Sequence, residues 1–261
     1  MLAKGLNMNI VLLTDFGYQD GFVGVMKGVI KSLSTHVTLI DLAHSVPDYD
    51  ILRGALLLEA HYSYFPKGTI FLCVIDPGVG SDRQPIIVKS GGYYFVAPHN
   101  GILDLVTAIE DIEQCIEITN KTYMLESDAN SFHGRDIFAP IAAHLANGIS
   151  MENMGDEIQY DWFLNYPFST YNEEEKTVIG EILSFDKYGN ALTNLRARKG
   201  IKSGRVLEQD AKFCDYFLQG NDRLPNLING SFGRVEIFVP EKNAEKHLRL
   251  RKGDEVILYL K

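Results

Sequence analysis

Two acidic, glycine-rich turns each follow a short apolar run that has the composition of a buried strand. The run NIVLL (9–13) leads into Asp15, and the run TIFLCVI (69–75) leads into Asp76. In an open parallel sheet, ligands bind beyond the carboxyl ends of the strands, where both acids would lie. A carboxylate there can accept hydrogen bonds from a ribose diol or hold a cation, but it repels a phosphate. Neither turn has GxGxxG or GxxxxGK[ST] spacing, which disfavours a dinucleotide-binding or P-loop site.

Two further side chains suited to chemistry stand in short polar segments. Arg83 shares one tight loop with Asp76, and His133 lies in SFHGRDIFAP (131–140), an otherwise apolar stretch. The usual pKa of histidine lies near neutrality and suits proton transfer, whereas an arginine stays protonated and stabilises negative charge. A lone histidine is often structural and a lone arginine is often a surface charge. The catalytic interpretation therefore requires both side chains to lie beside Asp76.

Each acid also has a structural interpretation. Asp15 and Asp20 could cap the helix that follows them, and Asp76, which precedes a proline, could start a turn. Asp136 could cap a helix through residues 140–145, and Arg135 could pair with a nearby acid. Asp15, Asp20 and Asp76 could instead hold a metal ion together, although the sequence has no HExxH or HxH pattern.

A fourth polar segment, FDKYGNALTN (185–194), lies in the second half of the chain. By composition it is a hairpin turn, because a Gly-Asn pair adopts positive φ angles readily. The functional alternative uses the aromatic face of Tyr188 and the amide of Asn190. Those two groups can stack on an adenine ring and hydrogen-bond to its edge.

The helices and strands that must position these residues fall into two parts with different hydrophobic patterns. In residues 9–165, apolar strands without polar alternation are separated by amphipathic helices, which is typical of an α/β domain with a mostly parallel sheet. We expect strands at 9–13, 37–42, 69–75, 85–89 and 93–97, and helices at 21–34, 49–64 and from 102 onward.

The second part changes character after a segment that looks like a linker, YPFSTYNEEEK (166–176). Residues 177–261 contain short β-like runs divided by turn signals, which predicts a smaller all-β domain, a barrel or a sandwich. We expect strands at 177–185, 191–195, 234–239 and 255–259.

Composition excludes several classes of protein. The chain has 261 residues with a net charge of −9, which argues against nucleic acid or an anionic membrane as the main partner. No apolar stretch approaches the roughly 20 residues of a membrane-spanning helix, and no targeting signal is recognisable at the start. The three cysteines are far apart, so neither disulfides nor a cysteine-rich zinc site organise the fold. These features predict a cytoplasmic protein.

The polar segments together resemble a known family, the S-adenosylmethionine (SAM) hydroxide adenosyltransferases, or adenosine-forming SAM hydrolases, which are related to fluorinases and chlorinases. The similarity runs from about residue 9 to the C-terminus, and the order and spacing of its motifs are more specific than any one of them. The motifs are TDFGYQDGFVGVMKG (14–28), IDPGVGSDR (75–83), FHGRDIFAP (132–140), FDKYGNALTN (185–194) and NGSFGRVEIF (229–238).

The resemblance implies an N-terminal α/β domain, a smaller C-terminal β-barrel, and a homotrimer whose active sites form between subunits. It places the water-activating set on Asp76, Arg83 and His133, and the acid that holds the ribose hydroxyls on Asp15. The remaining substrate contacts that it implies are Asp20 and Asp186 near the methionine ammonium and carboxylate, Tyr188 and Asn190 on adenine, and Ser231 near the methionine end.

The implied reaction is hydrolysis of SAM to adenosine and L-methionine by activated water at the ribose C5′. Methionine leaves as a neutral thioether, so the site must improve the nucleophile rather than protonate the leaving group. We therefore expect no redox cofactor and no required metal, with SAM as the small-molecule substrate. The residues leave open whether Asp76 or His133 takes the proton. Three alternatives remain: a non-catalytic adenosine- or SAM-binding protein, a SAM-dependent halogenase, and a metal-dependent hydrolase.

Overall fold

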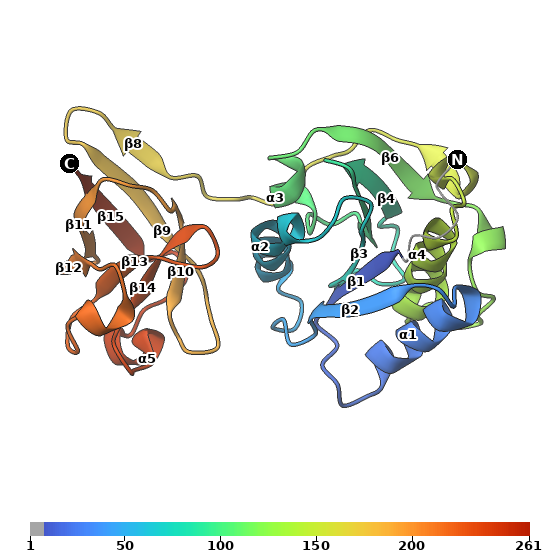
Figure 1. Ribbon diagram of the computed structural model, residues 1–261, viewed down its shortest axis with the longest axis horizontal. Helices are drawn as coiled ribbons and strands as arrows, with labels where there is room; N and C mark the ends of the chain where they lie inside the picture. The colour runs from blue at the N-terminus through green and yellow to red at the C-terminus, as the bar shows by residue number, and fades with distance from the viewer. Residues whose placement is uncertain (1–7) are drawn as a thin grey trace. The chain divides into compact units, whose positions relative to one another are not determined.

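The computed structural model describes residues 8–261, and its contacts divide the chain into two compact units between Leu164 and Asn165 (Figure 1). The first unit is mixed α/β and the second is a β-barrel, which confirms the predicted fold class. No helix within residues 8–261 is long and apolar enough to cross a membrane. The prediction that the start of the chain carries no targeting signal concerns residues 1–7 as well, which lie outside the described part.

The first unit is built on a seven-stranded sheet within the described residues, in the order β2-β1-β3-β5-β4-β6-β7. Its neighbours β2, β1, β3 and β5 are parallel, whereas β4, β6 and β7 pair antiparallel at the other side. The strands are β1 (Asn9–Thr14), β2 (Thr38–Ala43), β3 (Ile70–Val74), β4 (Pro85–Ser90), β5 (Tyr93–Pro98), β6 (Ile112–Ile118) and β7 (Gly155–Glu157).

Apolar residues of this sheet are buried on both of its faces. Ile10 and Leu12 pack into a core with Met26 of α1, whereas Val11 and Leu13 pack into a second core with residues that include Leu58 of α2. This burial on both sides explains why the strands read as unbroken apolar runs. The helices are α1 (Phe22–Leu33), α2 (Ile51–His61), α3 (Asp104–Thr107) and α4 (Ala139–Ala146), the last preceded by a π-helical turn, η3 (Gly134–Phe138).

The second unit is a barrel that closes through seven strands, because β9 pairs with both β15 and β10. Alternate side chains from its strands, such as Ile182, Leu227 and Val235, fill the interior. The barrel order is β10 (Ala191–Arg196), β14 (Arg234–Phe238), β13 (Asn226–Asn229), β12 (Gln209–Phe213), β11 (Ile201–Val206), β15 (Glu255–Leu260) and β9 (Thr177–Phe185). The short helix α5 (Ala244–Leu248) follows β14 in the sequence.

Three local expectations differ from the structure. Residues 166–176 are not a plain linker, because Thr170–Asn172 forms the strand β8 and pairs with β9. The helix expected from residue 102 is a single turn, α3. The strands β6, β7, β11, β12 and β13 were not predicted, since charged or polar residues interrupt their apolar pattern, as in IEQCIEI of β6 and QDAKF of β12.

Substitution of Gly204 tests the packing of the barrel. A Cβ atom there would lie 2.4 Å from Cδ1 of Leu227 and 2.5 Å from the carbonyl oxygen of Ile257. We expect Gly204→Ala to lower the stability of the barrel by about 1–3 kcal/mol, the usual range for overpacking. Gly28→Ala in α1, where a Cβ atom would meet nothing within 4 Å beyond its own helix backbone, should instead add about 0.5–1 kcal/mol. Thermal unfolding of both variants checks this, and equal shifts would contradict the packing argument.

Candidate active site

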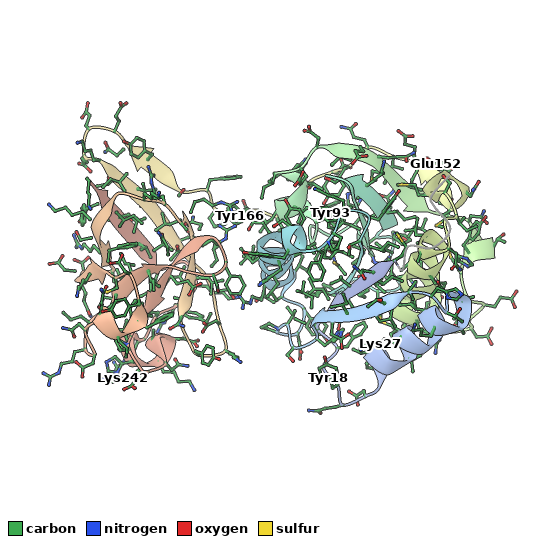
Figure 2. The ribbon with its side chains drawn as sticks, in the orientation of Figure 1. Tyr18, Lys27, Tyr93, Glu152, Tyr166 and Lys242 are labelled. Atoms are coloured by element: carbon green, nitrogen blue, oxygen red, sulfur yellow. The ribbon has the colours of Figure 1, made fainter. Side chains whose placement is uncertain are left out.

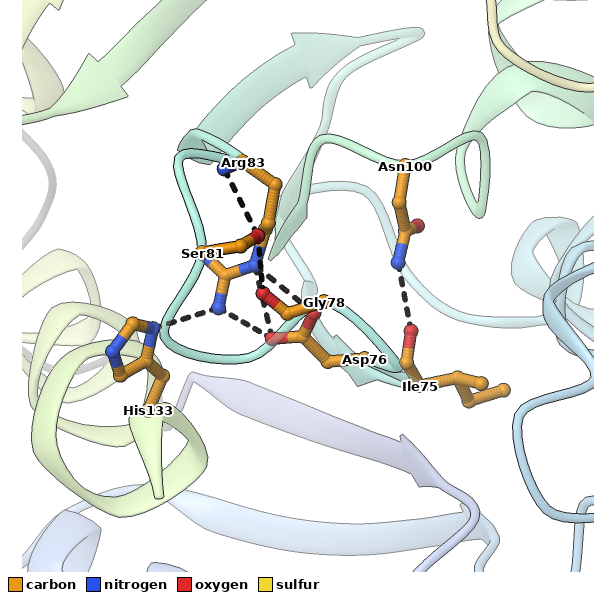
Figure 3. Close-up of polar contacts among 7 residues, drawn as sticks. All are labelled: Ile75, Asp76, Gly78, Ser81, Arg83, Asn100 and His133. Atoms are coloured by element: carbon orange, nitrogen blue, oxygen red, sulfur yellow. Dashed lines mark hydrogen bonds and ion pairs between the residues drawn. The ribbon is translucent and has the colours of Figure 1, made fainter. Parts of the chain in front are cut away.

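The structure brings Asp76, Arg83 and His133 together, as the catalytic interpretation requires (Figure 3). Nε of Arg83 donates to both carboxylate oxygens of Asp76 at 3.0 Å, and its Nη2 forms a further ion pair with Oδ2. The same Nη2 lies 2.7 Å from Nδ1 of His133. One guanidinium nitrogen therefore links the carboxylate to the imidazole.

The loop between β3 and β4 holds this cluster in place. The Ser81 hydroxyl donates to the carbonyl oxygen of Gly78 at 2.6 Å, which closes the loop between Asp76 and Arg83. The side chain of Asn100 donates to the carbonyl oxygen of Ile75 at 2.9 Å and so fixes the end of the strand that carries Asp76 (Figure 3).

The same loop passes very close to the segment that precedes His133. At Gly80, where φ is +78°, a Cβ atom would lie 2.8 Å from the carbonyl oxygen of Asn130. A glycine is therefore needed both for the left-handed backbone and for the close approach of the two segments.

The cluster is largely withdrawn from solvent. The side chains of Asp76 and Arg83 are 4% and 10% exposed, and the guanidinium lies 5.2 Å from the ring centre of Phe138. Burial, followed by the positive charge of Arg83, lowers the pKa of His133, so the imidazole is neutral at pH 7. Because Arg83 donates to Nδ1, the neutral ring carries its proton on Nε2.

Arg83 retains hydrogen-bonding capacity after these contacts are made. Its Nη1 atom is buried and has no hydrogen-bond partner among residues 8–261. A buried N–H group without a partner is costly unless a ligand or solvent group completes it. This nitrogen therefore has donor capacity that no described residue uses.

A cavity of about 310 Å³ opens beside the cluster. Asp76 and His133 line it together with a group of aromatic rings. Phe16, Phe22 and Phe132 contact one another edge to face, with ring centres 5.0–5.8 Å apart. The cavity is thus mainly apolar with a polar end, which suits an organic substrate that reacts at one point.

Asp15 lies at the carboxyl end of β1, and its Oδ2 accepts a hydrogen bond from the backbone N–H of Tyr49 at 2.9 Å. Burial raises the pKa of Asp15, and the charges of Asp48 and Asp76 add to the effect. The capping interpretation of Asp15 and Asp20 is wrong, because α1 begins after Gly21, whose left-handed backbone starts the helix. Asp20 is exposed in the loop between β1 and α1.

A second cavity, of about 590 Å³, lies in the barrel unit. It is lined by all four of the residues predicted in this half of the chain: Asp186, Tyr188, Asn190 and Ser231. The hairpin interpretation also holds, because Oδ1 of Asp186 accepts from the backbone N–H groups of Tyr188 and Asn190 at 2.9 and 2.8 Å. The turn leaves the Tyr188 ring 65% exposed and available for stacking.

Several residues that line or support these cavities were not found from the sequence. Phe217, Glu236 and residues 239–243 complete the wall of the barrel cavity. Phe217 begins a short 3-10 turn, Phe217–Gln219, between β12 and β13, two strands that were not predicted from the sequence. His44 and Tyr49 contact the turn that carries Asp15, but only the parallel pairing of β1 with β2 brings them near it.

The polar residues beside His133 serve the local structure. Nε of Arg135 donates to Oδ1 of Asp136 at 2.6 Å, which confirms the predicted pairing with a nearby acid. Asp136 lies inside η3, so its predicted role as a helix cap is wrong. In the described part of the chain, no group of three or more His, Cys, Asp or Glu side chains is arranged to hold a metal ion.

Comparison with known proteins identifies both units. A family model for the SAM hydroxide adenosyltransferase N-terminal domain matches residues 10–155, and the model for the C-terminal domain matches residues 180–257.

Individual relatives span nearly the whole chain. An (R)-S-adenosyl-L-methionine hydrolase from Thermus thermophilus is 32% identical over 95% of this chain and 98% of its own length. A Methanocaldococcus jannaschii protein of the same name is 30% identical over 96% of this chain and 95% of its own length. A fluorinase from Nocardia brasiliensis is 24% identical over 74% of this chain and 73% of its own length. The crystal structure of an uncharacterized conserved protein from Thermotoga maritima has a TM-score of 0.85 at 32% identity, covering 96% and 99%.

The electrostatic coupling within the cluster is testable by NMR titration of the imidazoles. Arg83→Gln removes a positive charge, so the pKa of His133 should rise, whereas Asp76→Asn removes a negative charge and should lower it. His144, whose pKa is lowered by burial alone, should keep its pKa in both variants. Shifts of His133 in the same direction in both variants would contradict the arrangement.

Proposed function

This chain belongs to the SAM hydroxide adenosyltransferase family, and we propose that it is an enzyme that hydrolyses S-adenosyl-L-methionine to adenosine and L-methionine. The observation that carries the proposal is the buried Asp76–Arg83–His133 cluster at the polar end of an apolar cavity. The names of relatives at 30–36% identity support the same reaction.

The reaction is a displacement at the ribose C5′ carbon. The oxygen of water forms a bond to C5′, and the C5′–S bond breaks with its electron pair passing to sulfur. Methionine leaves as a neutral thioether, and the attacking water loses one proton. One proton and one electron pair account for the whole change, so the proposed step needs no redox cofactor.

We assign the proton to Asp76. Nδ1 of His133 already accepts from Arg83, and its Nε2 carries a proton, so the neutral ring offers no free acceptor. The carboxylate oxygens of Asp76 retain lone pairs after the Arg83 contacts are made. Arg83 stabilises the developing hydroxide, and His133 keeps the guanidinium in place. General-base catalysis contributes about 10²–10⁴-fold, whereas alignment of the reactants contributes about 7–11 kcal/mol.

The remaining contacts divide between the two units. We propose that Asp15 accepts hydrogen bonds from the ribose hydroxyls and that Asp20 and Asp186 lie near the methionine ammonium and carboxylate. Tyr188 stacks on adenine, and Asn190 reads its edge. Ser231 completes the methionine end.

The two sets of contacts sit on different units, and we propose that a complete site forms between the α/β unit of one subunit and the barrel of another, in a homotrimer. Cyclic homo-oligomers bring two different surfaces of a chain together at every interface, which this arrangement requires.

Hydrolysis is favoured over halogenation by the charge of the cluster. The carboxylate of Asp76 lines the cavity and would repel a halide ion, whereas it accepts a hydrogen bond from water. A non-catalytic binding protein would not need a buried acid–arginine–histidine cluster at the cavity wall.

Chromatography of purified protein incubated with SAM tests the reaction. We expect adenosine and methionine in equal amounts, and a rate that falls by about 10²-fold or more in Asp76→Asn.

His133→Ala should also lower the rate while adenosine still binds, and Asp15→Ala should weaken the binding of adenosine. Addition of chelator or chloride separates the metal-dependent and halogenase alternatives. Recovery of intact SAM at stoichiometric amounts would instead identify a binding protein.

Co-expression of two inactive variants tests the shared site. Asp76→Asn disables the α/β half, and Asn190→Ala disables the barrel half. In randomly mixed trimers with sites between subunits, about a quarter of sites combine two intact halves and should recover that share of activity. Sites built within single chains would recover none.

A further inference from the structure

A buried histidine that the proposed reaction does not use lies directly behind the acidic turn. His44 follows β2 and is 1% exposed, and its Nδ1 lies 2.8 Å from the hydroxyl oxygen of Thr14, the residue before Asp15. Its Nε2 lies 3.0 Å from Oδ1 of Asp41, whose Oδ2 binds Nζ of Lys27 at 2.7 Å. The ring of Tyr18 lies 5.2 Å from the imidazole, centre to centre, and both Tyr18 and Lys27 are labelled in Figure 2.

The groups around His44 determine which of its two ring nitrogens carries the proton. Burial lowers the pKa of His44, so the ring is neutral. The Asp41 carboxylate lies 3.0 Å from Nε2 as a close ion-pair contact and favours the proton on that nitrogen. Nδ1 is then an acceptor, and the Thr14 hydroxyl donates to it. The Thr14 oxygen in turn accepts from the backbone N–H of Phe16 at 3.3 Å. The two residues that flank Asp15 are thus tied to one imidazole.

The backbone after β2 holds the same turn from the other side. The carbonyl oxygen of His44 accepts from the N–H of Gly17 at 2.7 Å, and the N–H of Tyr49 donates to Oδ2 of Asp15. Tyr49 has a φ angle of +64°, an unfavourable conformation for a bulky residue. Such strain persists where the surrounding structure requires it, here in the segment that directs the Asp15 carboxylate.

We propose that His44 is a positioning residue that fixes the orientation of the Asp15 carboxylate for a ligand with a vicinal diol. Asp41 favours the tautomer that accepts from Thr14, and Lys27 pairs with Asp41, so ion pairs and hydrogen bonds together link α1, β2 and the acidic turn. His44 contacts no substrate in this scheme and acts through Thr14 and the backbone. The inference rests on the proposed role of Asp15 toward ribose.

Competition between two nucleosides separates this role from general stabilisation. We would measure dissociation constants for adenosine and for 2′,3′-dideoxyadenosine with the full-length protein by calorimetry. The native protein should prefer adenosine, and His44→Leu should lose about tenfold in affinity for adenosine with little change for the dideoxynucleoside. His44→Asn, which can place an acceptor near Thr14, should retain more of the preference than His44→Gln.

A double-variant cycle identifies the route of the effect. If His44 acts through Asp15, His44→Leu combined with Asp15→Asn should bind adenosine no more weakly than Asp15→Asn alone. His144→Leu is the matched control, because His144 is a half-buried histidine of the same unit that also contacts a tyrosine ring, Tyr123. It should lower thermal stability without changing the preference for the diol.

The outcomes separate the inference from the proposed function. A native protein that prefers adenosine, together with a His44→Leu variant that keeps the full preference, would overturn the positioning role and leave the proposed reaction standing. Equal weakening of both nucleosides in His44→Leu and His44→Asn would also overturn it. A native protein with no preference for the diol would instead refute the assignment of Asp15 to ribose, and the inference with it.

Discussion

The shared Nη2 nitrogen of Arg83 is the contact on which the site depends. It binds Asp76 and His133 at once, and His133 lies 50 positions after Arg83 in the chain. A buried carboxylate alone would take up a proton, and a buried guanidinium alone would be strongly destabilising. Paired, each group compensates the other's charge at low solvent exposure, and Nη1 of the guanidinium has no hydrogen-bond partner among residues 8–261.

The parallel pairing of β1 with β3 explains why Asp15 and Asp76 lie near each other. β1 and β3 are parallel neighbours in register, Thr14 opposite Val74, so the residues that follow them emerge at the same edge. The α4 side of the sheet then supplies His133 from the turn that leads into η3. Parallel topology thus converts two separate acidic turns into one surface, as the general rule for ligand sites in such sheets predicts.

The sequence was sufficient for the strong apolar runs and for the polar turns that end them. Asp76, Arg83 and His133 could be proposed because each stands out in type against an apolar or glycine-rich background. β6 and β12 could not, since their alternation is broken by charges. His44 was also missed as a neighbour of the turn that carries Asp15, because its position depends on the register of β1 with β2, in which Leu13 lies opposite Ala43.

The charge of the site also bears on the rate of the proposed displacement. Asp48 and Asp76 lie close enough to Asp15 to raise its pKa. The negative field of these three acids would favour a cationic sulfonium. The displacement, however, consumes that positive charge, so a field that is too negative would stabilise the bound substrate more than the transition state and slow the reaction. In the proposed reaction, Arg83 would reduce this ground-state stabilisation by neutralising Asp76, and it would also donate to the hydroxide. Arg83 would thus weaken the electrostatic binding of the substrate but favour the transition state. This explains why an acid–arginine pair suits the proposed chemistry better than an acid alone.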